Sequence, residues 1–325
     1  MNTQIIDWQT ISPQQKKDAL ARPAIADNAL LSTQVANILS QVQKQGDKAL
    51  FSLTEQFDGI ALSTLSVTAE QVEQAKLALT DKRLKAINTA YGQIKRFHSA
   101  QTPQDVFVET CPGVRCTLKT EAIESVGLYI PAGSAPLPST VLMLGVPAQL
   151  AGCKRTVLVC PPDKNGQLAN EILVAAALCE ITEIYTIGGA QAIAALAYGT
   201  TSIPAVNKVF GPGNRYVTEA KKQLSQQVAG FAIDMPAGPS EVLVIGDEKA
   251  NAAFIAADLL SQAEHGSDSQ VILLTDSEQL IKNVANELET QVALLTRREI
   301  AKQALKQSRL ILNQDMAQAV KVSNL

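Results

Sequence analysis

The sequence predicts an α/β protein with two doubly wound, incompletely Rossmann-like lobes of parallel sheet and an N-terminal helical segment. Three observations support this class. Strand and helix patterns alternate from about residue 125 onward, as in right-handed βαβ units. A segment rich in proline and glycine at 236–239 divides the alternation into two sets. The length of 325 residues and the apolar content of 46% suffice for two hydrophobic cores.

We expect the chain to divide into three regions. Residues 1–104 form the helical segment, part of which packs on the second lobe. Residues 105–236 form the first α/β lobe, and residues 237–325 form the second. The helical segment carries signals that begin and end helices. These are Ser12-Pro13, a pattern over 30–45 that stops at Gly46, the capping box at 68–71 and the long helix at 81–98.

The alternation after residue 103 predicts the individual elements. A hairpin of residues 106–110 and 114–120 turns at Pro112-Gly113. In the first lobe we expect strands at 125–130, 156–160, 183–187 and 208–210, and helices at 139–152, 168–179, 191–198 and 216–227. In the second lobe we expect strands at 241–245, 271–275 and 309–312, and helices at 250–263, 277–294 and 298–306.

Composition excludes several classes of function. The net charge is −3 without a basic run, and aromatic residues make up only 4%, so a nucleic-acid partner is not expected. The start has no signal-peptide pattern, and no apolar run approaches the length of a membrane span. The five cysteines form no C-x-x-C pair, which favours reduced thiols and a cytoplasmic location.

Glycine-rich loops follow three strands of the predicted first lobe, at 127–134, 188–191 and 210–214. Parallel sheets bind ligands at the carboxyl ends of their strands, and helix N-termini beneath such loops attract phosphate. Any one of these loops is ordinary turn chemistry, whereas three on one edge favour a dinucleotide or a phosphate. None has the G-x-G-x-x-G spacing, since Tyr216 stands where the third glycine would be. A Walker A sequence is absent as well.

Gln262 and His265 lie three residues apart at the end of a predicted helix, and His265 is one of only two histidines. Side chains at this spacing project from one helix face and can share a metal ion. The stretch alone favours the alternative that His265 caps the helix before Gly266. Ser240, in the proline- and glycine-rich segment before the strand at 241–245, lacks the pattern of a serine nucleophile.

With these segments together, the chain resembles the histidinol dehydrogenase family from its first helices to its last residue. The resemblance is carried by Val-Gly-Leu-Tyr-Ile-Pro at 126–131, Ser-Ala-Pro-Leu at 134–137, Ser-Thr-Val-Leu-Met-Leu at 139–144, Gly-Gly-Ala-Gln-Ala-Ile-Ala-Ala-Leu at 188–196, Phe-Gly-Pro-Gly-Asn at 210–214, Asp-Met-Pro-Ala-Gly-Pro-Ser-Glu-Val-Leu at 234–243 and Leu-Leu-Ser-Gln-Ala-Glu-His-Gly at 259–266.

The resemblance implies an enzyme that oxidises L-histidinol to L-histidine through histidinal, with two NAD molecules and a zinc ion. It implies NAD contacts at Tyr129, Gln191 and Asn214, which makes residues 105–236 the NAD-binding lobe. Gln262 and His265 match two of four zinc ligands and also face the substrate, and Ser240 matches a further substrate contact. Zinc would serve as a template and Lewis acid. The family is a homodimer with intertwined subunits.

The sequence departs from the family pattern at its end. The family's general-base Glu-His pair lies a few residues past the Ser-Asn that matches Ser323-Asn324, and this chain stops at Leu325. The remaining Asp and His ligands of zinc and the tail exchanged between subunits would lie there too. We therefore expect a truncated form that keeps the two-lobed fold and weak NAD binding, binds zinc poorly and turns over negligibly.

Two alternatives remain at this point. One is a thiol-dependent enzyme like an aldehyde dehydrogenase, with Cys160 at a predicted strand end as nucleophile. The opposing interpretation of Cys160 is a small buried apolar residue. The other alternative is a non-catalytic nucleotide-binding module, which would bind NAD without needing the metal and substrate.

Overall fold

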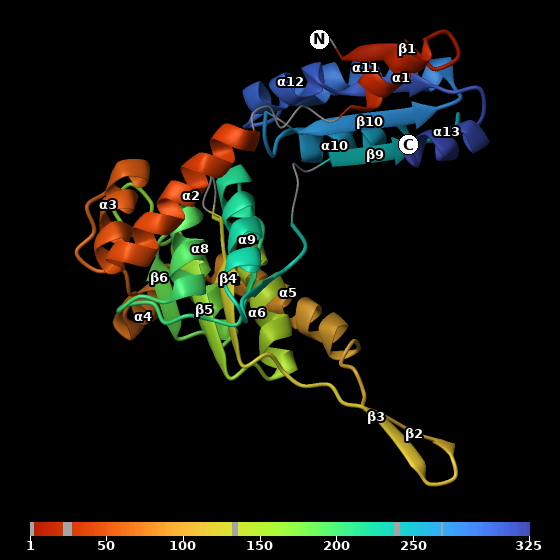
Figure 1. Cartoon of the computed structure of the whole chain (residues 1–325). Helices are drawn as coiled ribbons and strands as arrows, with labels where there is room; N and C mark the ends of the chain where they lie inside the picture. Colours follow the sequence, from red (N-terminus) through yellow and green to blue (C-terminus); the bar gives the residue numbers. More distant parts are fainter. Residues whose placement is uncertain (1–2, 22–27, 132–135, 237–240, 268) are drawn as a thin grey trace. The chain divides into compact units, whose positions relative to one another are not determined.

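The computed structural model describes residues 3–21, 28–131, 136–236, 241–267 and 269–325. The chain forms two compact units, one of residues 28–237 and one of residues 1–27 together with 238–325 (Figure 1). Each unit is built around its own parallel sheet, which confirms the predicted α/β class. The second unit is discontinuous in sequence because its first strand comes from the N-terminus.

The sheet of the unit 28–237 has five parallel strands in the order β6-β5-β4-β7-β8. Their bounds are Glu183–Thr186, Arg155–Cys160, Ser125–Tyr129, Lys208–Phe210 and Ala232–Ile233. From the central strand β4 the chain moves outward through β5 and β6, and it then returns to the other side of β4 for β7 and β8. The point where the order reverses lies between β4 and β7, where doubly wound sheets bind ligands.

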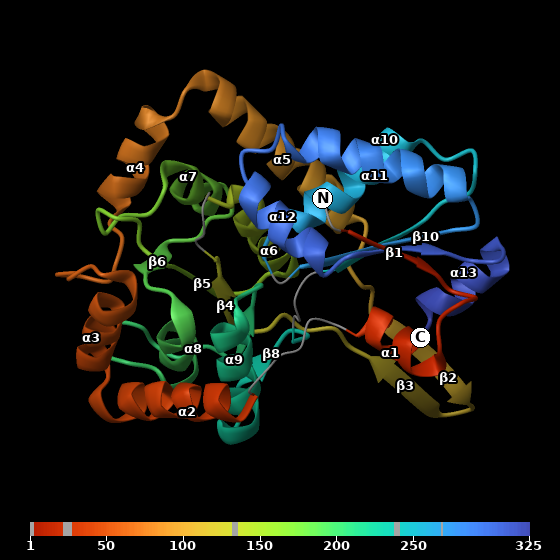
Figure 2. The same cartoon turned by 90° about the horizontal axis from the view of Figure 1, so that it is seen from above.

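Helices cover both faces of this sheet (Figure 2). One face carries α2 (Asn28–Gln45), α3 (Asp47–Asp58), α8 (Gly189–Tyr198) and α9 (Arg215–Gln227). The other carries α4 (Ala69–Ala78), α5 (Asp81–Ser99), α6 (Pro138–Ala151) and α7 (Asn170–Leu178). Alanine-rich α8 is almost wholly buried, since it lies between the sheet and the outer helices α2 and α3. The helices of 28–104 thus complete the core of this unit.

A two-stranded antiparallel hairpin belongs to the same unit. Its strands are β2 (Val106–Cys111) and β3 (Val114–Leu118), close to the predicted ranges, and every residue in them is exposed. Several large apolar side chains are among the exposed residues, Phe107 most of all, at 72%. The hairpin projects away from the five-stranded sheet (Figure 1).

The other unit has four parallel strands in the order β1-β11-β10-β9. Their bounds are Gln4–Asp7, Arg309–Leu312, Gln270–Thr275 and Glu241–Ile245. One face packs against α10 (Ala252–Ala263), α11 (Glu278–Val292) and α12 (Arg298–Lys306). The second face packs against α1 (Pro13–Leu20) and α13 (Met316–Ser323). Both lobes are therefore doubly wound, as the sequence predicts.

The prediction that the whole first hundred residues are helical is wrong at its start. Residues 4–7 form β1, which pairs with β11 about three hundred residues later in the chain. The strand is short and its partner is remote, so its sequence gives no local signal. Burial accounts for the strand, because Ile6 and the adjoining Trp8 enter the core on the face of the sheet that carries α1 and α13. The structure also adds α3, α13 and β8, which the sequence pattern did not reveal.

No helix in the described ranges is long and apolar enough to cross a membrane.

Glu180 lies in the turn that ends α7, and its backbone conformation can be tested by substitution. It is the one described non-glycine residue with a positive φ, 58°, and it stands one residue past the C-cap of α7. The bonds from Glu180 N to Ala177 O and from Ile181 N to Ala176 O complete a Schellman motif, in which glycine is the favoured residue.

We expect Glu180→Gly to raise the free energy of unfolding by roughly 1 kcal/mol, because it removes the left-handed backbone penalty. Glu180→Ala is the control, since it deletes the same exposed side chain and keeps the penalty. Chemical denaturation of both variants measures the difference. Equal stability of the two variants would contradict this account of the turn.

Candidate functional site

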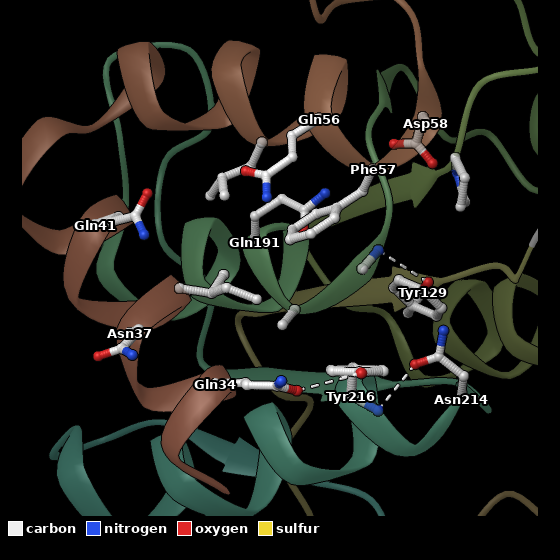
Figure 3. Close-up of a pocket in the computed structure, with 15 residues that line it drawn as sticks. Gln34, Asn37, Gln41, Gln56, Phe57, Asp58, Tyr129, Gln191, Asn214 and Tyr216 are labelled. Atoms are coloured by element: carbon white, nitrogen blue, oxygen red, sulfur yellow. Dashed lines mark hydrogen bonds between the residues drawn. The ribbon is translucent and has the colours of Figure 1, made fainter. Parts of the chain in front are cut away.

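A cavity of about 630 Å³ opens at the carboxyl edge of the five-stranded sheet (Figure 3). It lies within the unit 28–237, between the strand ends, the N-termini of α8 and α9, and the outer helices α2 and α3. The lining residues are Gln34, Asn37, Ile38, Gln41, Leu53, Gln56, Phe57, Asp58, Tyr129, Pro161, Gly189, Ala190, Gln191, Asn214 and Tyr216. The three residues predicted to contact NAD, Tyr129, Gln191 and Asn214, all line this one cavity.

Tyr129 is the last residue of β4 and is 3% exposed. Its phenolic oxygen accepts a hydrogen bond from the backbone N–H of Gly189 at 3.2 Å, so it ties the central strand to the start of α8. Burial raises the pKa of the Tyr129 phenol well above its usual value. The hydroxyl therefore stays protonated at neutral pH and keeps an O–H to donate.

Gln191 lies in the first turn of α8 and is 1% exposed. Its side-chain oxygen Oε1 is buried and has no hydrogen-bond partner. An unpaired buried acceptor costs roughly 1–3 kcal/mol, so such atoms are uncommon unless a ligand pairs with them. Because Gln191 lines the cavity, this oxygen is a candidate acceptor for an N–H group of a bound molecule.

Asn214 is the N-cap of α9. Its Oδ1 accepts hydrogen bonds from the backbone N–H groups of Tyr216 at 3.0 Å and Val217 at 3.1 Å. The capping bonds fix the side chain, and its amide nitrogen Nδ2 points to the side of the cavity where Tyr129 lies (Figure 3). Asn214 is thus both the start of the helix and a donor to the cavity.

The loop between β7 and α9 approaches β4 closely at Gly211. This residue has a φ of 123°, and a Cβ built on it would lie 2.1 Å from the carbonyl oxygen of Tyr129. Only glycine can occupy this position without a shift of backbone. The close approach brings the loop that carries Asn214 against the strand end that carries Tyr129.

The outer wall of the cavity comes from α2 and α3, which the sequence did not mark as part of the site. It presents amide side chains of Gln34, Asn37, Gln41 and Gln56, together with Phe57 and Asp58 (Figure 3). The hydroxyl of Tyr216 donates to Gln34 Oε1 at 3.3 Å, which joins this wall to α9. A run of amides on one amphipathic helix is ordinary surface composition, so the sequence carried no signal.

Asp58 is the one charged residue among the described residues lining the cavity. Partial burial raises the pKa of its carboxyl group. Among the described residues, neither lysine nor arginine contributes to the lining. Any phosphate bound here would therefore be held by backbone N–H groups and helix N-termini. The N-terminus of α8 fits this role, because its N-cap, Gly188, makes no side-chain capping bond.

These features fit NAD. The volume lies in the usual range for small-molecule sites, the N-terminus of α8 can receive an anion, and Gln191 supplies an unpaired acceptor.

The predicted metal and substrate residues belong to the other unit. Gln262 lies in the last turn of α10, and its Nε2 is buried without a hydrogen-bond partner. His265 is exposed and follows the helix in a turn closed by its N–H donating to Gln262 O at 3.1 Å. Gln262 is therefore within the helix as expected, whereas His265 lies in the turn that follows it. Ser240 lies outside the described residues.

The described residues supply only part of a ligand set for zinc. They include no group of three or more His, Cys, Asp and Glu side chains that could hold a metal ion. Gln262 and His265 amount to two donors, whereas zinc takes about four ligands. The described residues do not by themselves make a zinc site.

Cys160, the nucleophile of the alternative interpretation, is buried at the end of β5. Burial raises the pKa of its thiol to about 12, so the reactive thiolate is scarce at neutral pH. The structure favours the interpretation of Cys160 as a small core residue.

A family profile, two curated relatives and a solved structure all point to one family. A family profile described as histidinol dehydrogenase matches residues 21–325. The histidinol dehydrogenase of Colwellia psychrerythraea is 82% identical over 324 residues, which cover 100% of this chain and 75% of that protein. That of Idiomarina loihiensis is 55% identical over 98% of this chain and 72% of its own length. The crystal structure of histidinol dehydrogenase from Elizabethkingia anophelis superposes with a TM-score of 0.92 at 44% identity, covering 99% of this chain and 73% of that one.

The close approach at Gly211 yields a prediction about stability. We expect Gly211→Ala to destabilise the unit by roughly 3 kcal/mol or more, because a methyl group adds steric overlap to an unfavourable φ. Gly230→Ala is the matched control: its φ is 79° and a Cβ there meets nothing within 4 Å, so roughly 1–2 kcal/mol is expected. Equal losses in urea denaturation would show that the loop does not pack on Tyr129.

Proposed function

The chain belongs to the histidinol dehydrogenase family, oxidoreductases of the final step of histidine biosynthesis, and we propose that it binds NAD in the cavity of the unit 28–237. The observation that carries the proposal is the buried, unpaired Oε1 of Gln191 in the cavity that Tyr129 and Asn214 also line. All three residues coincide with the positions that the resemblance assigns to NAD.

The number of electrons removed in the reaction determines how many NAD molecules it needs. Histidinol is a primary alcohol and histidine is a carboxylic acid, so their interconversion removes four electrons. NAD, when bound, supplies the hydride acceptor, and two NAD molecules are needed for each histidinol. The first oxidation gives the aldehyde histidinal, and its hydrate is the species oxidised second.

The protein's own part in this step is to bind and orient. The N-terminus of α8 favours the negative pyrophosphate through backbone N–H groups. Gln191 Oε1 accepts from an amide or amine N–H, Asn214 Nδ2 donates, and the protonated hydroxyl of Tyr129 donates to an oxygen. Because Tyr129 also bonds Gly189, the strand end and the helix start are fixed before a ligand arrives.

For the second unit we propose that Gln262 and His265 contribute two ligands to zinc and contacts to L-histidinol, with Ser240 a further substrate contact. The support is the match of the segment 259–266 to the family. The amide oxygen and the imidazole nitrogen would hold the ion, and zinc would act as a template that orients the substrate.

A substitution at Gln191 tests the NAD proposal. We expect Gln191→Met to weaken NAD binding at least tenfold in isothermal titration calorimetry, because the acceptor for the ligand is lost. The same change should leave the melting temperature unchanged or raise it, since it removes an unpaired buried acceptor.

Gln149→Met is the control for that experiment. Gln149 lies on α6, on the opposite face of the sheet, and its Oε1 accepts from the Tyr91 hydroxyl at 3.0 Å. We expect this variant to bind NAD like the unmodified chain. If Gln191→Met lowered stability and left NAD affinity unchanged, the amide would be a structural core group and the proposal would fail.

The two histidines provide a matched pair for zinc. We expect His265→Ala to weaken whatever zinc affinity the chain has at least tenfold, measured by competition with a chromophoric chelator. His98→Ala changes the other histidine of the chain, which lies on α5, and should have no effect. An equal loss in both variants would mean that zinc binds nonspecifically.

A further inference from the structure

Lys221 is a lysine buried in the core of the unit 28–237. It lies on α9, is 4% exposed and does not line the cavity. Its ammonium nitrogen Nζ donates to the carbonyl oxygen of Gly211 at 2.6 Å and to Asp234 Oδ1 at 2.6 Å. The side chain therefore spans from the middle of α9 back to the loop that precedes this helix.

Asp234 completes the arrangement from the other side. Its second oxygen, Oδ2, accepts from the backbone N–H of Gly211 at 2.7 Å. The backbone N–H of Asp234 donates to Val209 O at 3.1 Å, which fixes the residue beside β7. Both backbone polar groups of Gly211 are thus held by one ion pair, the N–H by the carboxylate and the C=O by the ammonium.

A lysine buried against a carboxylate whose side chain is 26% exposed needs an explanation beyond stability. Removing the ammonium group from water costs several kcal/mol, and well-packed apolar residues often replace buried ion pairs without loss. Burial also lowers the pKa of Lys221, and the hydrogen bond to Asp234 opposes this shift only in part. The pair does supply something that apolar side chains lack, namely a donor and an acceptor for Gly211.

Gly211 is the residue whose placement decides where the loop runs. Its φ of 123° and its close approach to the Tyr129 carbonyl require a glycine. Gly211 therefore has no side chain of its own that could hold the loop in place. Three residues later the loop reaches Asn214, which begins α9 and faces the cavity beside Tyr129 (Figure 3). A displacement of Gly211 would move Asn214 and the N-terminus of α9 together.

We propose that Lys221 and Asp234 are positioning residues for dinucleotide binding: they clamp Gly211 so that Asn214 and the N-terminus of α9 face the cavity in a fixed arrangement. The inference rests on the proposed NAD site. Neither side chain touches the ligand, and the effect passes through the backbone of Gly211.

Two variants separate positioning from a merely structural role. Lys221→Met removes the ammonium and leaves the Asp234 carboxylate without its counter-charge, so it should lower both stability and NAD affinity. The double variant Lys221→Met with Asp234→Asn removes both charges and keeps an acceptor for Gly211 N–H. We expect the double variant to recover most of the lost stability while its NAD dissociation constant stays at least tenfold above that of the unmodified chain.

Titration calorimetry well below the melting temperature measures the affinities. Val146→Ala on α6, a cavity-forming change on the opposite face of the sheet, is the control for destabilisation alone and should bind NAD normally. The proposal is overturned if the double variant binds NAD as tightly as the unmodified chain, or if Val146→Ala loses affinity in proportion to its stability.

Hydrogen exchange tests the clamp without any ligand. In Lys221→Met with Asp234→Asn we expect the amides of residues 211–217 to exchange at least tenfold faster, with the rest of the sheet unchanged. Unchanged exchange in this segment would overturn the clamp itself. Faster exchange in a chain whose unmodified form binds no NAD would instead retain the clamp and reject the proposed NAD site.

Discussion

The site depends on the reversal of strand order between β4 and β7. In a parallel sheet all carboxyl ends lie on one edge, and the chain leaves β4 and β7 toward opposite sides. The two strand ends therefore bound a crevice instead of being covered by a crossover. Tyr129 ends one strand and Gly211 follows the other, and the glycine lets the two backbones approach more closely than any side chain would allow.

The polar groups around this crevice are fixed before a ligand binds. Tyr129 joins β4 to α8, and Asn214 caps α9. Lys221 and Asp234 hold the loop between β7 and α9 at Gly211. Gln191 stands apart because its buried oxygen has no partner. A rigid frame with one unsatisfied acceptor is the arrangement expected of a site whose binding energy is spent on recognition and little on ordering the protein.

The sequence predicted the fold class and most elements of both sheets, because alternating strands and helices leave strong periodic signals. It also marked the three loops that meet at the cavity. It did not reveal β1, whose pairing partner β11 is about three hundred residues away, nor the outer wall of α2 and α3, whose amides look like ordinary surface. Lys221 and Asp234 were invisible for a similar reason: thirteen positions separate them, and only the tertiary fold brings them together around Gly211. Metal binding by Gln262 and His265 was inferred from the resemblance, and it remains a prediction.

A crystal structure of this chain with NAD tests the proposed site most directly. We expect NAD in the cavity of the unit 28–237, with its pyrophosphate at the N-terminus of α8 and a nitrogen of the cofactor donating to Gln191 Oε1 at about 3 Å. NAD bound elsewhere, or in this cavity with Gln191 Oε1 still unpaired, would contradict this expectation.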